Sequence, residues 1–308
     1  MSKNRVLILT CQKYPDISTW NAVREDLVVK ALQKRGVEVR AQVWDELDLE
    51  QVDRNYLLLL RAVWDYHLRV PEFSSWLAKV EDLKVKVMNP IPIVKWNIHK
   101  SYLLELSEKG IPIPDTMMVK KGSDVPSLPQ TMTEKKRDKL IVKACIGAQN
   151  FMLERIMSEA QAAEYQDTFR EQLQHHDMLV QEYIEGVEKY GEWSLLFFNR
   201  QFSHCVNKMP LEGDYRAFIL LGGAVTSYEP SQEMLDLAEK VLALVPGPLL
   251  YARVDLMKHH LTGKLYLGEL ELIEPTLFLD FHEKAPERLA DAILSYMQNP
   301  DNLNKTSN

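Results

Sequence analysis

Residues 251–274 read YARVDLMKHHLTGKLYLGELELIE, two largely apolar runs on either side of a polar turn. Charged and apolar residues alternate in both runs, a pattern that predicts a β-hairpin. Successive side chains of a strand point to opposite faces, so Asp255 shares a face with Arg253, and Glu269 shares a face with Glu271. The sequence therefore predicts three carboxylates together on one face of a two-stranded ribbon.

The spacing of these carboxylates indicates a metal site. Carboxylates at close range repel one another strongly unless a cation neutralises them. A set made only of oxygen donors suits Mg²⁺, with Mn²⁺ as an alternative. We therefore predict Asp255, Glu269 and Glu271 as metal ligands. The alternative is an acidic face exposed to water, because most charged side chains lie on the surface.

Composition limits the class of protein. The chain has 308 residues, a formal net charge of −7 and 46% hydrophobic residues, with no run long enough to span a bilayer. The apolar run at residues 6–10 is too short for a signal peptide, and the cysteines (Cys11, Cys145 and Cys205) form no CxxC motif. These features predict a cytoplasmic protein without a membrane or nucleic-acid partner. They leave the oligomeric state open.

The first 89 residues predict a βαβ domain. Apolar strands are expected at residues 5–10 and 37–43, with a helix over 21–34 between them. A further strand over 56–63 ends near Arg61 and Trp64, where open α/β sheets place ligand contacts. Pro90 and Pro92 interrupt any regular element, and we place a domain boundary there. Asp16, Asn21, Arg61, Trp64 and Arg253 are the candidate substrate contacts.

The remainder predicts two α+β lobes, in an overall mixture of α/β and α+β structure. For residues 90–186 we expect a linker helix at 95–109, a polar loop at 120–138 and the regular elements of a central lobe from 139 on. That lobe has strands at 139–144 and 178–183 around a helix at 158–172. For residues 187–308 we expect strands at 193–198, 202–206 and 218–221, a helix at 232–244, the ribbon and a closing helix at 286–298.

Several residues of the two lobes are suited to a nucleotide. Lys143 lies on a strand among apolar neighbours, where it either directs its charge at phosphate oxygens or extends to solvent at a sheet edge. The turn at Gly147 is a further candidate, since its backbone N–H groups would be able to cover phosphates, although a single glycine is a weak signal for such a loop. The segment VQEYI at 180–184 runs into a glycine turn, and Glu182 either accepts an adenine amino group or is an exposed strand glutamate.

Two further cations are candidates for catalysis. Lys208 and Arg216 lie in a hairpin-like stretch that ends in Gly222-Gly223. Arginine geometry suits carboxylate or phosphate, whereas surface salt bridges are the common alternative for both residues. The sequence contains no GxxxxGK[ST], GxGxxG, HExxH or GxSxG motif, which argues against the corresponding nucleotide and hydrolase sites.

In this order, the motifs resemble the ATP-grasp superfamily, in the branch with glutathione-synthetase-like ATP-binding domains. The resemblance covers most of the chain and is carried by Lys100 ahead of GIPIP, Lys143, VQEYI, DYRAF, RVD and GELELIEP. The fragments LLRAVWDY and GELELIEPTLFL are similar to a subgroup that includes a cycloserine-forming ligase. The implied fold has a βαβ N-terminal domain followed by two α+β lobes that enclose ATP.

The resemblance implies a role for each group of residues. Lys100 and Lys143 would bind phosphates, and Gln181, Glu182, Tyr183 and Ile184 would bind adenine. Asp255, Glu269 and Glu271 would hold magnesium, although many members have asparagine where this chain has Glu271. The loop at Gly147 is also poorer in glycine than the usual phosphate lid.

The resemblance implies an ATP-dependent carboxylate–amine ligase. A substrate carboxylate, of an amino acid or small peptide, would attack the γ-phosphate to give an acyl phosphate, which an amine then attacks. Lys208 and Arg216 would stabilise the charge that develops during transfer. Two alternatives stay open: a nucleotide-binding protein without turnover, and a phosphotransferase acting on a hydroxyl. The substrate, and whether the product is an amide, a peptide or a ring, stay open as well.

Overall fold

The computed structural model describes residues 4–15, 24–211 and 223–298. The predicted βαβ opening is confirmed in a parallel sheet of order β2-β1-β3-β4. Strands β1 and β3 are buried along nearly their whole length, as their continuous apolar runs require in a sheet covered on both faces. The bounds in this domain are β1 (Arg5–Thr10), α1 (Asp26–Lys34), β2 (Glu38–Val43), β3 (Tyr56–Leu60), α2 (Val70–Asp82) and β4 (Val87–Met88). Short 3₁₀ turns occupy Trp44–Glu46 and Tyr66–Leu68.

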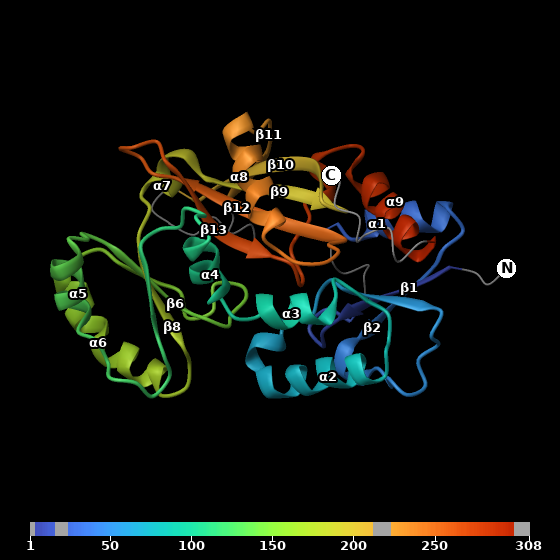
Figure 1. Ribbon diagram of the computed structural model, residues 1–308, viewed down its shortest axis with the longest axis horizontal. Coiled ribbons are helices and arrows are strands. Elements are labelled where there is room, and N and C mark those ends of the chain that lie inside the picture. The colour runs from blue at the N-terminus through green and yellow to red at the C-terminus, as the bar shows by residue number, and fades with distance from the viewer. Residues whose placement is uncertain (1–3, 16–23, 212–222, 299–308) are drawn as a thin grey trace.

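The central lobe is a four-stranded antiparallel sheet covered by two helices (Figure 1). Its strand order is β5-β8-β6-β7, and its core lies between the sheet and the helix pair. The bounds are β5 (Thr116–Val119), α5 (Leu128–Lys135), β6 (Leu140–Ala144), β7 (Glu154–Ile156), α6 (Glu159–Leu173) and β8 (Met178–Glu182). The strands and the long helix expected here are confirmed.

The loop expected over 120–138 is wrong, because it contains helix α5. The Ser127 hydroxyl caps this helix by accepting from the Gln130 N–H at 3.3 Å. Pro129 lies in the first turn, where its missing N–H has no intrahelical acceptor in any case. The prolines that indicated a loop therefore mark the start of a helix.

The single helix expected over 95–109 is also wrong. The chain forms α3 (Ile91–Asn97) and α4 (Tyr102–Glu108), with a break that contains Lys100. In the break the Lys100 backbone N–H donates to the Cys145 carbonyl at 2.8 Å, a contact outside any helix. The break therefore holds the Lys100 backbone against the central lobe, which sets the position from which its side chain extends.

The C-terminal lobe is built on a five-stranded antiparallel sheet of order β11-β10-β9-β12-β13. The bounds are α7 (Gly186–Tyr190), β9 (Glu192–Phe198), β10 (Gln201–Met209), β11 (Ala224–Tyr228), α8 (Gln232–Ala243), β12 (Tyr251–Lys258), β13 (Leu265–Glu271), a 3₁₀ turn (Leu279–Phe281) and α9 (Ala285–Gln298). Strand β11 was not expected, and the strand expected at 218–221 lies outside the described residues.

Polar contacts join the ribbon β12–β13 to Asn89 of the N-terminal domain and to Asn97 of the following helix α3. The Asn89 side-chain amide donates to the carbonyls of Tyr251 and Leu272 at 2.9 and 2.7 Å. Asn97 likewise donates to the Leu270 carbonyl at 2.8 Å and accepts from the Leu272 N–H at 2.8 Å. Each buried amide thus satisfies backbone groups of the ribbon, which positions its acidic face.

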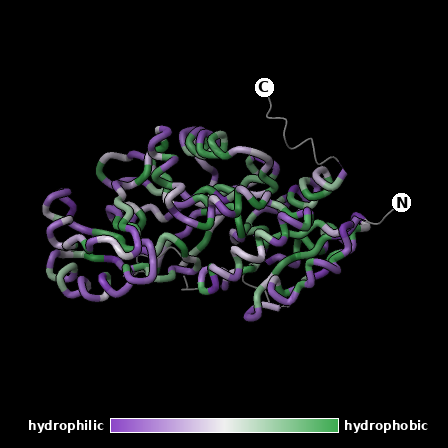
Figure 2. The backbone as a smooth tube through the Cα atoms, turned by 60° about the horizontal axis from the view of Figure 1, so that its bottom comes forward, coloured by the Kyte–Doolittle hydropathy of each residue, from purple (hydrophilic) through white to green (hydrophobic). Residues whose placement is uncertain are grey.

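The C-terminal helix also returns to the N-terminal domain. Helix α9 packs beside α1, and Arg35 pairs with Asp291 at 2.9 Å (Figure 1). Hydrophobic stretches gather along the middle of the molecule in Figure 2, where the sheets of the first and last domains adjoin. Each of the three sheets falls within one of the segments 1–89, 90–186 and 187–308, which we keep as proposed domain limits.

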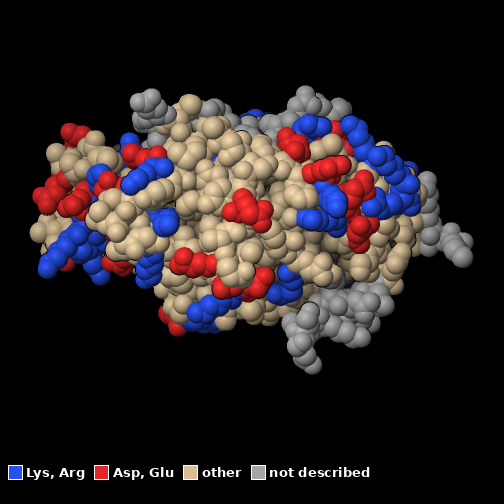
Figure 3. Space-filling model, turned by 90° about the horizontal axis from the view of Figure 1, so that it is seen from above, with Lys and Arg blue, Asp and Glu red and all other residues tan. Residues whose placement is uncertain are grey.

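Charged side chains are unevenly distributed over one face of the molecule (Figure 3). On the face drawn in Figure 3, basic and acidic side chains lie next to one another at both ends, with few of either over the middle. Among the helices that the structure describes, none combines the length and apolarity needed to cross a membrane.

Candidate nucleotide and metal site

A cavity of about 280 Å³ lies where the three parts of the chain meet. Its walls come from the loop after β6, the end of β8, the paired strands β12 and β13, and the turn after β3 in the N-terminal domain. Clefts of this size between lobes are common binding sites for small molecules. Most of the residues singled out from the sequence line this cavity.

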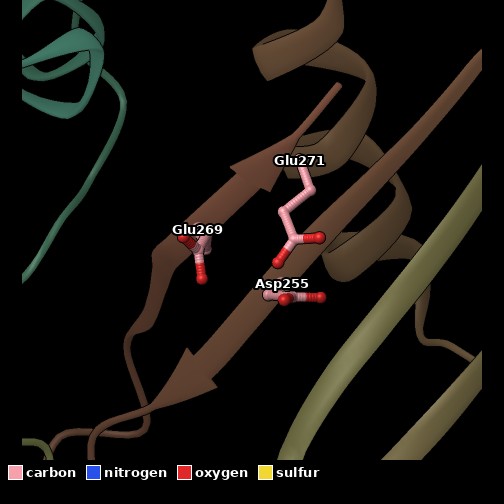
Figure 4. A group of neighbouring side chains, drawn as sticks. All are labelled: Asp255, Glu269 and Glu271. Carbon is pink, nitrogen blue, oxygen red and sulfur yellow. The ribbon is translucent and has the colours of Figure 1, made fainter. Parts of the chain in front are cut away.

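The three carboxylates of the ribbon lie together at the cavity floor. Figure 4 shows Asp255 on one strand and Glu269 and Glu271 on its neighbour, with their carboxylates on the same side. One oxygen from each lies within 4.8 Å of the others, and the strand register pairs Asp255 with Glu269. The strand alternation therefore places the acids as expected, and their role as metal ligands stays a prediction.

Asp255 is enclosed by donors from its own and neighbouring strands. Arg253 donates through Nε at 3.0 Å and through Nη2 at 2.9 Å, and the Ser194 hydroxyl donates at 2.6 Å. Lys208 lies 3.4 Å away and also contacts Glu192. Burial alone would raise the pKa of Asp255, but Arg253 and Lys208 outweigh it and lower the pKa to about 2.

The two glutamates of β13 differ in their surroundings. Lys100 lies 3.1 Å from Glu269, so the pKa of this carboxyl is lowered although burial opposes the shift. Glu271 contacts Arg253, but burial outweighs that contact and raises its pKa to about 7. The three acids therefore differ in how readily they carry charge.

Cations from the protein itself reduce the repulsion among the three acids. The repulsion among the acids was expected to require a metal ion, yet Arg253, Lys208 and Lys100 neutralise part of it. The donor set still fits Mg²⁺, since all three donors are carboxylate oxygens. Oxygens on one Mg²⁺ are at most about 4.2 Å apart, because each bond is about 2.1 Å. The observed spread needs only a small side-chain adjustment to meet that limit.

Lys143 lines the cavity from β6. No other described residue forms a hydrogen bond or ion pair with its ammonium, although Glu269 lies close enough to influence it. Burial lowers the pKa of Lys143. A half-buried ammonium that no described residue pairs fits an anionic ligand better than the alternative of a lysine that extends to solvent.

The loop after β6 closes one side of the cavity. Lys100 donates to the Gly147 carbonyl at 2.8 Å, so this lysine contacts both the loop and a carboxylate. Phe151 lies edge-on between His67 and His176, with ring centroids 5.0 and 5.7 Å away. The loop that was expected to cover phosphates is thus anchored on the N-terminal domain and on the central lobe.

The segment expected to bind adenine lies at the end of β8. Gln181, Glu182, Tyr183 and Ile184 all line the cavity. Gln181 uses its amide to donate to Thr116 at 2.8 Å, whereas the Glu182 carboxylate lies 4.0 Å from the His259 ring. The Ile184 backbone N–H donates to no other described residue, so it is available for a ligand.

One substrate assignment is wrong, and three residues cannot be placed. Arg61 is 2% exposed and pairs with Glu25 at 2.6 Å and with the Pro275 carbonyl at 2.7 Å, so it holds the domain core and does not line the cavity. Trp64 and Arg253 do line the cavity. The remaining candidates, Asp16, Asn21 and Arg216, lie outside the described residues.

The sequence reasoning missed three polar residues of the cavity region. Glu192 and Ser194 on β9 contact Lys208 and Asp255. Glu274, just after the ribbon, is 8% exposed, and burial together with Glu271 raises its pKa to about 8. Its place in the quoted motif GELELIEP was the one available signal.

Comparison with known proteins defines the class. Residues 96–270 match the RimK-like ATP-grasp domain, and residues 6–89 match the N-terminal domain of the D-cycloserine synthetase DcsG. The first match covers more than half of the chain, which therefore belongs to the RimK-like ATP-grasp family. The expected ATP-grasp fold and the class of ATP-dependent ligase are confirmed. Members of this class use ATP with magnesium.

Individual relatives agree with this class. The cycloserine biosynthesis protein DcsG of Streptomyces lavendulae is 24% identical over 282 residues, which cover 86% of this chain and 91% of DcsG. The crystal structure of D-cycloserine synthetase DcsG is similar with a TM-score of 0.80 and 21% identity, covering 95% of this chain and 99% of the other. An ATP complex of the D-alanine–D-alanine ligase from Bacillus anthracis gives 0.65 and 17%, covering 97% and 98%.

Proposed function

We propose that this protein activates a substrate carboxylate as an acyl phosphate, using ATP and Mg²⁺, and joins it to an amine or similar nucleophile. The observation that carries the proposal is the cluster of three carboxylates facing one cavity together with Lys100 and Lys143. Anionic oxygens for a cation beside cations for an anion are what a magnesium-bound triphosphate requires.

Each end of the nucleotide has its own residues in this proposal. Asp255, Glu269 and Glu271 hold Mg²⁺, which when bound neutralises phosphate charge. Lys143 and Lys100 bind phosphate oxygens, with the loop at Gly147 over them. Adenine lies against Gln181, Glu182, Tyr183 and Ile184, where the Ile184 N–H is free among the described residues.

The reaction needs positioning more than covalent catalysis. A substrate carboxylate oxygen attacks the γ-phosphorus and ADP leaves, which gives the acyl phosphate. A neutral amine then attacks the acyl carbon, and inorganic phosphate leaves as the amine loses a proton. Lys208, Arg253 and Arg216 are the cations proposed to stabilise the transferring charge, and the first two lie at the cavity floor.

The relatives support a small substrate with amino-acid character. Their names describe a D-cycloserine synthetase, a D-alanine–D-alanine ligase and an ATP-grasp ligase, PsnB, whose complexes hold a precursor peptide or Mg and ADP. We extend to this chain the class of amino acids or small peptides, with Trp64 as a contact. The proposed location is the cytoplasm.

ADP release measured with a panel of amino acids and dipeptides tests the proposal. We expect substrate-dependent ADP formation that requires Mg²⁺, and mass spectrometry should detect a new amide. A phosphorylated hydroxyl in the product would indicate phosphotransfer instead. If the protein does not bind ATP in magnesium buffer, the proposal is wrong.

One observation favours the alternative of nucleotide binding without turnover. Asp255 already receives donors from Arg253, Ser194 and Lys208, so a metal ion must compete for its oxygens. Nucleotide binding without ADP release above background, across the whole panel, would support this alternative.

A further inference from the structure

Glu274 is a buried carboxyl that the proposed chemistry does not use. It lines the cavity with only 8% of its surface exposed. Its carboxylate makes no hydrogen bond or ion pair with any residue that the structure describes. Buried polar groups are nearly always hydrogen-bonded, since leaving one unpaired is costly. An unpaired carboxyl inside a ligand cavity therefore suggests a ligand group as its partner.

The position of Glu274 separates it from the nucleotide. The turn of the β12–β13 ribbon lies beside the adenine segment, where His259 is 4.0 Å from Glu182. Strand β13 then leads past Glu269 and Glu271, and the residues that follow it contact Asn89 and Trp64 of the N-terminal domain. Glu274 follows three residues later, at most about 10 Å further along an extended chain. It therefore lies beyond the carboxylate cluster, at the end of the cavity away from adenine.

Aromatic side chains of the N-terminal domain surround this end. Tyr14 and Trp64 pack edge to face with centroids 5.1 Å apart, and both line the cavity. The Trp64 indole N–H donates to the backbone carbonyl of Glu274 at 3.1 Å, which holds the ring beside the carboxyl. Tyr66 also lines this end and is 5% exposed. A carboxylate next to aromatic faces is a favourable environment for an ammonium group.

We propose that Glu274, with Tyr14 and Trp64, binds a positively charged amino group of the substrate. This inference rests on the proposed ligase function and narrows its substrate to compounds that carry both a carboxylate and a free ammonium. An ammonium has no lone pair and cannot attack an acyl phosphate. The group held by Glu274 is therefore a recognition group, distinct from the attacking amine.

The charge of the site is consistent with this role. Burial is the main cause that raises the pKa of Glu274, and Glu271 adds to it. Lys100 and Arg61 oppose this shift without contacting the carboxyl. An ammonium at contact distance would offset the cost of burial and keep the carboxylate ionised.

The test compares ligand binding by wild-type protein and by Glu274→Gln. The full-length protein with Mg²⁺ and a non-hydrolysable ATP analogue is mixed with D- and L-amino acids, each paired with its N-acetyl derivative. Thermal stabilisation measures binding, and ADP release with ATP measures turnover. We expect at least one free amino acid to bind and its N-acetyl form not to bind. Glu274→Gln should weaken that amino acid at least about tenfold, as expected for loss of a charge-assisted contact.

The controls separate recognition from structure. Glu283→Gln alters an exposed carboxylate and should behave as wild type. Without ligand, Glu274→Gln should melt no lower than wild type, because the contact with Trp64 uses the backbone carbonyl. A lower melting temperature with unchanged amino-acid binding would mean a structural role and overturn the inference.

Other outcomes distinguish this inference from the proposed function. If the ATP analogue binds but no free amino acid does, or if N-acetyl forms bind equally well, the ammonium site is wrong and the nucleotide site stands. If the ATP analogue itself does not bind in magnesium buffer, the proposed function fails, and this inference fails with it.

Discussion

Arg253 and Asp255, two positions apart on β12, form a forked ion pair, with Nε 3.0 Å from Oδ1 and Nη2 2.9 Å from Oδ2. Asp255 is 1% exposed and Arg253 is 8% exposed, and both residues line the cavity, so this is a buried pair in the cavity floor. Removing one partner of a buried ion pair costs more stability than the intact pair contributes, because the remaining charge is buried without solvation or a counter-charge. Asp255 therefore has a structural role in addition to its proposed role as a metal ligand.

Asp255→Asn and Glu269→Gln should consequently differ in stability. Asp255→Asn removes the anion that Arg253 and Lys208 share and leaves them only Glu271 and Glu192, so we expect a loss of roughly 3 kcal/mol in the free energy of unfolding, at the low end for a broken buried pair. Glu269 is only half-buried, so Glu269→Gln should cost much less. Urea denaturation of both variants measures the difference. Equal stability would show that the Arg253–Asp255 pair contributes little to the fold.

Activity should fall in both of these variants. Each variant removes a proposed metal ligand, so ADP release at fixed Mg²⁺ should drop at least about tenfold. A tenfold loss is already typical when a residue that only supports a metal ligand is mutated. Raising the Mg²⁺ concentration should recover part of the activity of Glu269→Gln. Full turnover by Glu269→Gln at low Mg²⁺ would contradict the metal assignment.

Lys143→Met should weaken nucleotide binding without weakening the fold. The variant keeps the volume of the side chain but removes an ammonium that burial destabilises and that no described residue pairs. We expect the affinity for Mg-ATP to fall at least about tenfold through loss of a charge-assisted phosphate contact. The melting temperature should stay level or rise. Calorimetric titration and thermal unfolding give the two readouts.

Lys139→Met is the matched control for Lys143→Met. Lys139 precedes the same strand and pairs with Glu185 at 2.9 Å on the surface. Such pairs contribute roughly 0–1 kcal/mol, so nucleotide affinity and stability should both stay close to wild type. Equal losses of affinity in the two variants would mean that general charge, and not the position of Lys143, is responsible.

The acidic ribbon could be predicted because its geometry is local. Strand alternation and one turn fix which face Asp255 and Glu269 share, without reference to the rest of the chain. The donors around Asp255 could not be found in this way. Ser194 lies 61 residues away in sequence and reaches Asp255 only through the pairing of β9 with β12.

The errors have the same origin. Residues 95–109 have the composition of a single helix, but the contact between Lys100 and Cys145 interrupts it across 45 residues of chain. Arg61 lies where α/β sheets often bind ligands, but its guanidinium pairs with Glu25 and so is not available to a ligand. Long-range pairing therefore decides which polar residues remain free for a ligand.

Acid should destabilise this protein partly through His204. Burial lowers the pKa of His204 from 6.5 to about 4, and its ring nitrogen lies 2.9 Å from the Leu277 carbonyl. Between these two values the unfolded chain binds a proton that the folded protein does not bind, so stability is lost as pH falls from 6.5 to about 4. The loss should approach roughly 3 kcal/mol at the acid end.

Comparison with His204→Asn isolates this contribution from that of the carboxylates. The variant loses the buried ring and its contact with the Leu277 carbonyl, so it should be less stable than wild type near neutral pH. Because the variant cannot take up the proton that destabilises wild type, the difference in stability should narrow as pH falls. Denaturation curves at several pH values measure this difference. A constant difference across the range would show that protonation of His204 does not contribute.

Gly186→Ala tests whether the ribbon turn fixes the adenine segment. A Cβ at position 186 would lie 1.6 Å from the Lys258 carbonyl oxygen, so the start of α7 and the end of β12 would have to separate. Overpacking of this kind typically costs about 1–3 kcal/mol, and the end of β8 should move with α7. We expect weaker Mg-ATP binding together with a lower melting temperature. Glu185→Ala changes the neighbouring surface residue without this clash and should bind Mg-ATP normally. If Gly186→Ala binds Mg-ATP as well as Glu185→Ala does, the close approach of the two backbones is not needed to form the nucleotide site.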